Sequence, residues 1–177
     1  MLTEDELKAK LETLITPHRY AHSLNVMQTA VELAEIFGAD IEKCRIAGLV
    51  HDCAKSLSKG ELLELIEEAG IALYPGEGDM EQLLHAPGGA VFAKKELGIT
   101  DPEVLSAIRF HTVGRENMSL TEAIIYVADF IEPGRRDFEG LREVRELARR
   151  DIYAAVSECT RLSHEYCEQR GYPVLKV

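Results

Sequence analysis

Four side chains in this sequence combine residue types and positions that could hold a metal ion. His22, the adjacent pair His51 and Asp52, and Asp129 follow one another in that order. Imidazoles and carboxylates together form a mixed nitrogen and oxygen site, which suits Fe, Mn, Co, Ni or Zn and leaves positions for water and phosphate oxygens. No cysteine belongs to the set, which argues against a structural zinc site. The residue types therefore predict an open metal site.

Apolar periodicity indicates that helices carry these side chains into the protein. His22 lies four residues before Val26 and continues the stripe formed by Val26, Ala30, Leu33 and Phe37. His51 shares a helical face with Ile41, Cys44 and Gly48, and Asp52 points about 100° away. Asp129 lies in the apolar segment AIIYVADFI, where a lone carboxylate would cost several kcal/mol unless it were paired or metal-bound.

Each of these residues also has an ordinary explanation. An inward-facing histidine is more often a hydrogen-bonded core residue than a ligand, and a His-Asp dipeptide occurs by chance. Asp129 could be paired with an arginine such as Arg109. Taken together, these explanations need three separate coincidences on three helices, so we favour the metal site.

The remaining helix start and stop signals indicate helices along the whole chain. No segment shows the alternating apolar pattern of a strand. Capping boxes predict four helix starts, at Thr3 with Glu6, Ser58 with Glu61, Thr100 with Glu103, and Ser119 with Glu122. Thr16 before Pro17 predicts another start, and Gly38, Gly70 and Gly98 predict helix ends. Residues 141–170 lack glycine and proline, which indicates one long helix or two abutting ones. We predict a single all-α domain over residues 1–177.

One segment is expected to be irregular. Residues 73–90 contain Pro75, Pro87 and four glycines, and long ordered loops in compact domains are often functional. We expect His85 to open the turn before a helix that begins near Gly88, where N–H groups could hold a phosphate.

Composition limits the function classes. The chain has 177 residues, 46% of them hydrophobic and 29% charged, with a net charge of −11. An acidic chain without a Lys/Arg-rich run is not expected to bind nucleic acid, and no apolar run approaches the roughly 20 residues of a membrane span. The charged N-terminal segment and four scattered cysteines, without a CxxC pair, predict a cytoplasmic protein with reduced thiols.

Four segments resemble the HD phosphohydrolase superfamily, and within it the symmetrical diadenosine tetraphosphate hydrolases. They are HRYAHSLNV (18–26), HDCAK (51–55), HAPGGA (85–90) and HTVGRENMSLTEAIIYVADFIEPGR (111–135). The bare HD pattern is specific only to the superfamily, whereas HTVGR followed by ADFIEPGR is far more restrictive. The motif core, 18–135, covers about two thirds of the chain, and residues 136–177 form a helical tail.

The resemblance implies roles for individual residues. His22, His51, Asp52 and Asp129 correspond to metal ligands, with iron the expected metal. His85 and His111 correspond to further catalytic histidines, which either ligate a second metal or contact phosphate. Arg135 corresponds to a phosphate contact. Their ordinary alternatives are a solvated loop histidine for His85, a core histidine for His111 and a surface charge for Arg135.

Lys55 is a candidate for substrate binding on a level with Arg135, and Arg19 is a weaker one. Lys55 lies close in sequence to the HD pair, and Arg19 lies near the helix start at Thr16. Each could spread charge over phosphoryl oxygens, and each could equally be a solvated surface charge. Asp52 could orient the attacking water or accept its proton.

The implied reaction is cleavage of diadenosine tetraphosphate into two ADP molecules. One alternative is another HD-type nucleotide phosphohydrolase, such as a nucleotidase or a dNTP triphosphohydrolase. A second is a metal-free helical interaction module, and a third is a haem or di-iron oxygen-activating protein. The oligomeric state is left open, a homodimer included.

Overall fold

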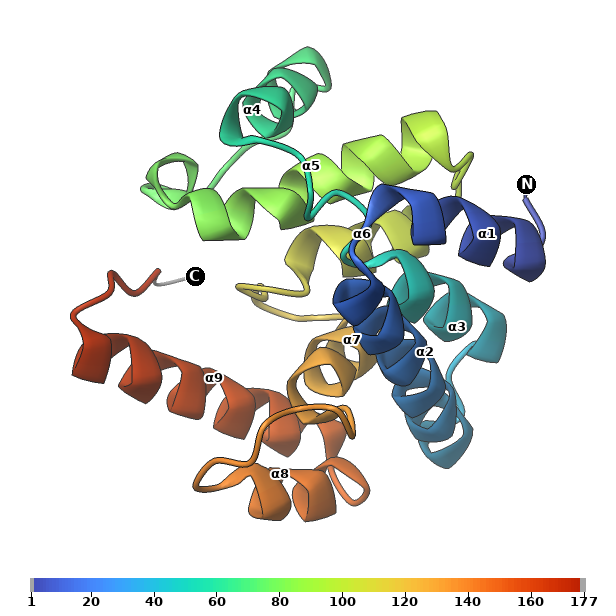
Figure 1. Ribbon diagram of the computed structural model, residues 1–177. Helices are drawn as coiled ribbons and strands as arrows, with labels where there is room; N and C mark the ends of the chain where they lie inside the picture. Colours follow the sequence, from blue (N-terminus) through green and yellow to red (C-terminus); the bar gives the residue numbers. More distant parts are fainter. Residues whose placement is uncertain (1, 176–177) are drawn as a thin grey trace.

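The computed structural model describes residues 2–175, and within them every regular element is helical (Figure 1). This confirms the predicted all-α class. The elements are α1 (Glu4–Leu14), α2 (Pro17–Phe37), α3 (Ile41–Val50), α4 (Lys59–Glu68), the 3-10 helix η1 (Glu77–Asp79), α5 (Glu81–Glu96), α6 (Pro102–Phe110), α7 (Leu120–Ile131), α8 (Leu141–Ala148) and α9 (Ile152–Arg170). Along residues 2–175, no helix is both long and apolar enough to cross a membrane.

Most predicted helix boundaries are confirmed. Capping boxes form at Thr3, Ser58 and Ser119, and Thr16 caps α2. The box at Thr100 is wrong, because Asp101 caps α6 by accepting from Glu103 N and Val104 N. Pro102 then occupies the first helical position, where its missing N–H costs nothing.

The prediction of an irregular segment over residues 73–90 is wrong for its second half, which is helical. α5 begins at Glu81, runs through Pro87 and continues to Glu96, so the N–H groups near Gly88 lie inside a helix. Pro87 cannot donate to the carbonyl four residues earlier, which normally disfavours a helix interior. Packing outweighs this local cost: a Cβ at Gly88 would lie 2.7 Å from Leu62 Cδ2 of α4, so the glycine permits close contact.

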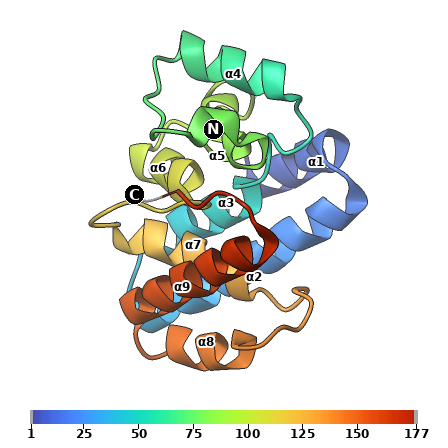
Figure 2. The same cartoon turned by 90° about the vertical axis from the view of Figure 1, so that its left-hand side faces the viewer.

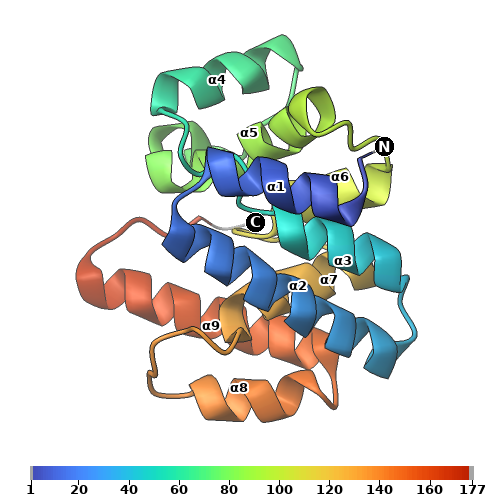
Figure 3. The same cartoon turned by 45° about the vertical axis from the view of Figure 1, so that its right-hand side comes forward.

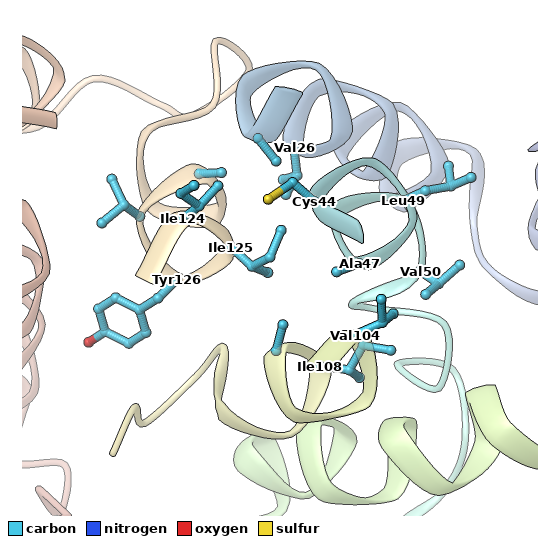
Figure 4. Packing of buried hydrophobic residues seen from close by; sticks show 14 of the residues in the cluster. Val26, Cys44, Ala47, Leu49, Val50, Val104, Ile108, Ile124, Ile125 and Tyr126 are labelled. Carbon is cyan, nitrogen blue, oxygen red and sulfur yellow. The ribbon is translucent and has the colours of Figure 1, made fainter. Parts of the chain in front are cut away.

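Helix α7 lies in the middle of the molecule and contacts α2, α3, α6, α8 and α9 (Figures 1 and 3). Figure 4 shows Val26, Cys44, Ile108 and Ile125, from four different helices, gathered in one buried core. The core therefore fixes α2, α3, α6 and α7 relative to one another, and these helices carry most of the candidate site residues.

Residues 141–170 form two helices, which is the second of the two predicted alternatives. α8 ends at Ala148, and Asp151 caps α9 by accepting from Tyr153 N and Ala154 N. Figure 2 shows α9 lying across α7 with α8 beside it. All four cysteines are free thiols, and three of them are buried.

Helices α2 and α3 approach closely at Gly48. A Cβ at this position would lie 2.9 Å from the Cα atom of Met27, which a larger residue could not tolerate without a backbone shift. The approach brings His22 on α2 and His51 at the end of α3 together, since Gly48 lies one turn before His51.

Candidate metal centre

Three histidines are oriented by the backbone of their own helices. The Nδ1 atoms of His51, His85 and His111 lie 2.8, 2.9 and 2.7 Å from the carbonyl oxygens of Gly48, Gln82 and Ile108, each three residues earlier. Each Nδ1–H therefore donates to a carbonyl, and each Nε2 presents a lone pair. Fixing the second ring nitrogen in this way is typical of metal-ligating histidines.

The four residues predicted to bind metal lie together. His22 Nε2 is 3.0 Å from Asp129 Oδ1 and 3.3 Å from His51 Nε2. The distance from His51 Nε2 is 3.9 Å both to Asp129 Oδ1 and to Asp52 Oδ2. The ligand atoms of His22, His51 and Asp129 all lie within 4.8 Å of one another, as a shared ion would require.

Asp52 also faces the two additional histidines. Its Oδ1 is 3.1 Å from His85 Nε2 and 3.6 Å from His111 Nε2, and these two nitrogens are 3.1 Å apart. Among the described residues, none donates a hydrogen bond to this buried oxygen. A carboxylate oxygen surrounded by imidazole lone pairs is satisfied by a cation, so the donor set fits a metal ion. We call His22, His51, Asp52, His85, His111 and Asp129 the histidine–aspartate cluster.

The protonation states suit a cation site. Burial lowers the pKa of both His51 and His85 to about 4, so these rings are neutral at physiological pH. Burial also acts on Asp52 and Asp129, but nearby positive and imidazole groups hold the pKa of each carboxyl well below its ordinary value. The cluster therefore combines the neutral imidazoles of His51 and His85 with two ionised carboxylates.

His22 differs because both of its ring nitrogens face carboxylates. Burial acts to lower its pKa, but the contacts with Asp129 and Glu132 outweigh burial, and the pKa is raised. This ring takes up a proton more readily than those of His51 and His85, so protons compete more strongly with a metal at His22 than at these two residues.

The three predicted substrate cations border the cluster. Lys55 Nζ lies 2.7 Å from His85 Nε2 and 3.6 Å from Asp52 Oδ1. Arg135 donates to the backbone oxygen and to Oδ1 of Asp129, at 2.8 and 2.6 Å. Arg19 Nη1 is 3.7 Å from Asp52 Oδ2. Each carboxylate of the cluster thus has a cation within 4 Å.

The suggested pairing of Asp129 with Arg109 is wrong, because Arg109 pairs with Glu77. Its Nη1 and Nη2 donate to the two oxygens of Glu77 at 2.8 and 2.7 Å, and Glu77 is fully buried in η1. Asp129 instead contacts Arg135, a partner only six residues away.

Glu132 is a buried carboxylate that sequence reasoning missed. It is 3% exposed, its Oε1 lies 3.2 Å from His22 Nδ1, and it accepts from Asn25 Nδ2 at 2.9 Å and from Gly134 N. The available signal was its position three residues after Asp129, which places both carboxylates on one helical face. A carboxylate behind a ligating histidine orients the ring and raises its basicity.

We expect Glu132→Gln to weaken metal affinity about 10- to 100-fold, because His22 loses the carboxylate that orients it. Competition with a metal-sensitive dye measures the affinity. Glu139→Gln is a matched control, since Glu139 is an exposed carboxylate in the same segment. Equal affinities of the two variants would contradict a role for Glu132 in orienting His22.

A cavity of about 290 Å³ opens beside the cluster. One part is formed by cluster residues and their cations: Lys55, His85, His111, Asp129 and Arg135. The other part is lined by Gln82, Thr112, Tyr126, Phe130, Phe138 and Ser163. The cluster is thus reached through a chamber with both charged and aromatic walls.

Comparisons with known proteins agree with the resemblance noted from the sequence. The model of the HD domain family matches residues 19–134. The symmetrical bis(5'-nucleosyl)-tetraphosphatase of Halalkalibacterium halodurans is 48% identical over 146 residues, which cover 80% of this chain and 75% of the relative. The enzyme of the same name from Bacillus subtilis is 40% identical, over 98% of this chain and 92% of the relative.

A solved structure is similar over nearly the whole chain. It is the crystal structure of a predicted HD superfamily hydrolase involved in NAD metabolism from Clostridium acetobutylicum, with a TM-score of 0.93 and 43% identity. The match covers 99% of this chain and 92% of that one.

Proposed function

Because the chain belongs to the HD domain family, and within it to the symmetrical bis(5'-nucleosyl)-tetraphosphatases, we propose that it hydrolyses diadenosine tetraphosphate into two ADP molecules in a metal-dependent reaction. The observation that carries the proposal is the histidine–aspartate cluster, in which two ionised carboxylates meet imidazole lone pairs beside a cavity. We propose the cytoplasm as its compartment, in keeping with its free cysteines.

His22, His51, Asp52 and Asp129 would hold the first metal ion, for which we propose iron, with Mn, Co, Ni or Zn as alternatives. A divalent ion supplies Lewis acidity, since it polarises a phosphoryl oxygen and lowers the pKa of a water molecule. Asp52 is ionised and can orient the attacking water by accepting a hydrogen bond from it. Lys55, Arg19 and Arg135 donate hydrogen bonds to the phosphate oxygens as charge develops on them.

For His85 and His111 we propose binding of a second metal ion together with Asp52. Support comes from their Nε2 atoms, which present lone pairs and therefore accept a cation more readily than they donate to a phosphate. Direct phosphate contact, the alternative, would require a proton on Nε2. With a second metal ion bound, Lys55, which lies close to His85 Nε2 and Asp52 Oδ1, would turn away from them towards the substrate.

We expect His85→Ala to reduce the metal content of the protein from two ions per chain to one. Elemental analysis after dialysis against trace metal measures the ratio, and His18→Ala is the control, because His18 is an exposed histidine outside the cluster. One ion per chain in both the parent and the His85 variant would instead assign His85 to phosphate.

The reaction itself is tested by incubating metal-loaded protein with diadenosine tetraphosphate, ATP, dGTP and AMP and separating the products. We expect ADP as the product of the dinucleotide, with a much higher kcat/KM than for ATP, because remote binding energy helps to align the scissile bond. AMP plus ATP would mean asymmetric cleavage and contradict the proposal. Nucleoside plus triphosphate from dGTP, or phosphate from AMP, would identify a different HD-type activity. No hydrolysis by metal-loaded protein would favour an interaction module.

Acid should inhibit the enzyme by displacing metal. The pKa of His22 is raised, so this ring is protonated at a higher pH than an ordinary histidine, and metal binding needs the neutral ring. Activity should therefore be complete well above the ordinary histidine pKa of about 6.5 and fall as pH decreases through the raised value. Rate profiles at low and high metal concentration measure the effect, and excess metal should shift the midpoint to lower pH. A midpoint independent of metal would point to a general base or to unfolding.

A further inference from the structure

An exposed aromatic side chain stands at the edge of the cavity beside the histidine–aspartate cluster. Phe138 is 40% exposed and lies in the segment that joins α7 to α8. Its ring meets that of Phe130 edge-on, with centroids 5.5 Å apart and planes at 88°. Phe130 directly follows Asp129 in α7. Phe130 is thus the direct neighbour of a cluster residue in the chain, and Phe138 contacts Phe130 through its ring.

Phe130 holds Phe138 in place. Phe130 is half-buried and packs against the hydrophobic core, and both phenylalanines line the cavity. The edge-on contact is the geometry that aromatic pairs prefer, so it restrains the Phe138 ring. The ring retains exposed surface because the described residues cover it only in part.

One residue that lines the same cavity carries a polar group without a partner. The hydroxyl oxygen of Thr112 is buried, and no described residue forms a hydrogen bond with it. Thr112 follows His111 and lines the cavity together with Gln82 and Ser163. Rotation of the Thr112 side chain into the cavity would bring this hydroxyl to the edge of a base, which carries both donor and acceptor atoms, whereas an aliphatic ligand offers neither.

The volume indicates how much of the substrate the cavity takes. About 290 Å³ lies just below the range for small-molecule sites, which is roughly 300–1,000 Å³. That space suits one nucleoside with its nearest phosphates and does not suit both nucleosides of a dinucleotide. Arg135 lines the cavity and donates to Asp129, so a phosphate bound beside Arg135 would lie next to the cluster.

We propose that Phe138 is the platform on which one adenine base of the substrate stacks, with Phe130 as its support and the Thr112 hydroxyl at the edge of the base. The assignment rests on the proposed function, because the cluster is taken as the place where the phosphates bind. The second nucleoside lies outside the cavity. Phe138 is thus a residue that determines specificity for a nucleoside over a bare polyphosphate.

The test compares a ligand that has a base with one that lacks it. Calorimetry on metal-loaded protein measures the affinity for ADP and for inorganic pyrophosphate, in the parent and in Phe138→Ala. Loss of a stacking platform should weaken ADP binding about tenfold, within the range measured for base–aromatic contacts. Pyrophosphate binding should change less than about twofold, because Phe138 does not contact the phosphates. Phe138→Tyr keeps the ring and should bind ADP like the parent.

Tyr153→Ala is the matched control. Tyr153 is another half-exposed aromatic residue, ten positions before Ser163 in α9 and therefore about 15 Å from it along the helix. Its removal should leave both affinities unchanged. Phe138→Leu keeps an apolar side chain should the alanine variant fold poorly, and it should still bind ADP less tightly than the tyrosine variant.

Three results would overturn the inference. Unchanged ADP affinity in Phe138→Ala would show that no base stacks there. Equal weakening of ADP and pyrophosphate would mean that Phe138 acts on the cluster and not on a base. A change of oligomeric state with unchanged ADP affinity would assign the ring to a contact between two copies of the chain. The proposed function is judged separately, by whether the parent protein releases ADP from diadenosine tetraphosphate.

Discussion

Replacing Asp129 with alanine should lower kcat for diadenosine tetraphosphate by about 10³-fold or more, equivalent to about 4 kcal/mol of barrier, and should reduce the bound metal. Asp129 Oδ1 lies 3.0 Å from His22 Nε2 and 2.6 Å from Arg135 Nη2, so its loss removes an anionic ligand and leaves an imidazole and a guanidinium facing each other. The first ion site would then have lost one of its two carboxylates.

The measurement combines single-turnover kinetics with elemental analysis. Asp129→Asn tests the charge alone, because the amide keeps the shape of the side chain and should show a similar loss. Asp137→Ala, in the exposed segment after α7, is the control for a deleted carboxylate and should act like the parent. Hydrolysis near the parent rate by an Asp129→Ala protein without metal would refute the assignment of the site.

Arg109→Ala should lower the free energy of unfolding by about 3–5 kcal/mol, because it leaves the carboxylate of Glu77 buried without its cation. Both Glu77 oxygens accept from Arg109, and one of them also accepts from Tyr74 N. The guanidinium further lies 5.5 and 5.0 Å from the ring centroids of Tyr74 and Phe110. These contacts fasten the segment before α5 to the end of α6.

Urea unfolding of the metal-free protein measures this effect. The double variant Glu77→Gln with Arg109→Met removes both charges and should be more stable than Arg109→Ala alone, since no buried charge stays unpaired. Arg142→Ala, on the exposed face of α8, should change stability by less than about 1 kcal/mol and is the control. A loss below about 1 kcal/mol for Arg109→Ala would show that the Glu77 carboxylate finds another partner or takes up a proton.

The sequence predicts those parts of the fold that depend on neighbouring residues. The start of α2 follows from Thr16 and Pro17, and the stripe through Val26 and Leu33 identifies its buried face. The same stripe directs His22 inward, and the structure brings it beside His51 and Asp129. Local signals succeeded here because capping and periodicity act within a few residues along the chain.

Features that depend on packing between distant segments were not predictable. Pro87, Gly88 and Gly89 normally disfavour a helix, yet α5 passes through them because the glycines allow contact with Leu62 and with α6. Glu77 and Arg109 are 32 residues apart, and nothing near either residue identifies the other as its partner. Thr100 and Asp101 are adjacent, and each could cap α6. Pro102 follows Asp101 and favours the first helical position, so Asp101 is the cap.

The backbone contacts of the cluster histidines have a consequence for the entropy of metal capture. In His51, His85 and His111 the ring is held by a carbonyl of its own helix, so its rotamer is restricted when the helix forms. The ordering of three ligands is therefore complete in the metal-free chain and does not oppose association with the ion, as it does where binding and folding are coupled. Metal capture then requires desolvation of the ion and displacement of protons or of Lys55 and Arg135, while the imidazoles keep the positions that their helices give them.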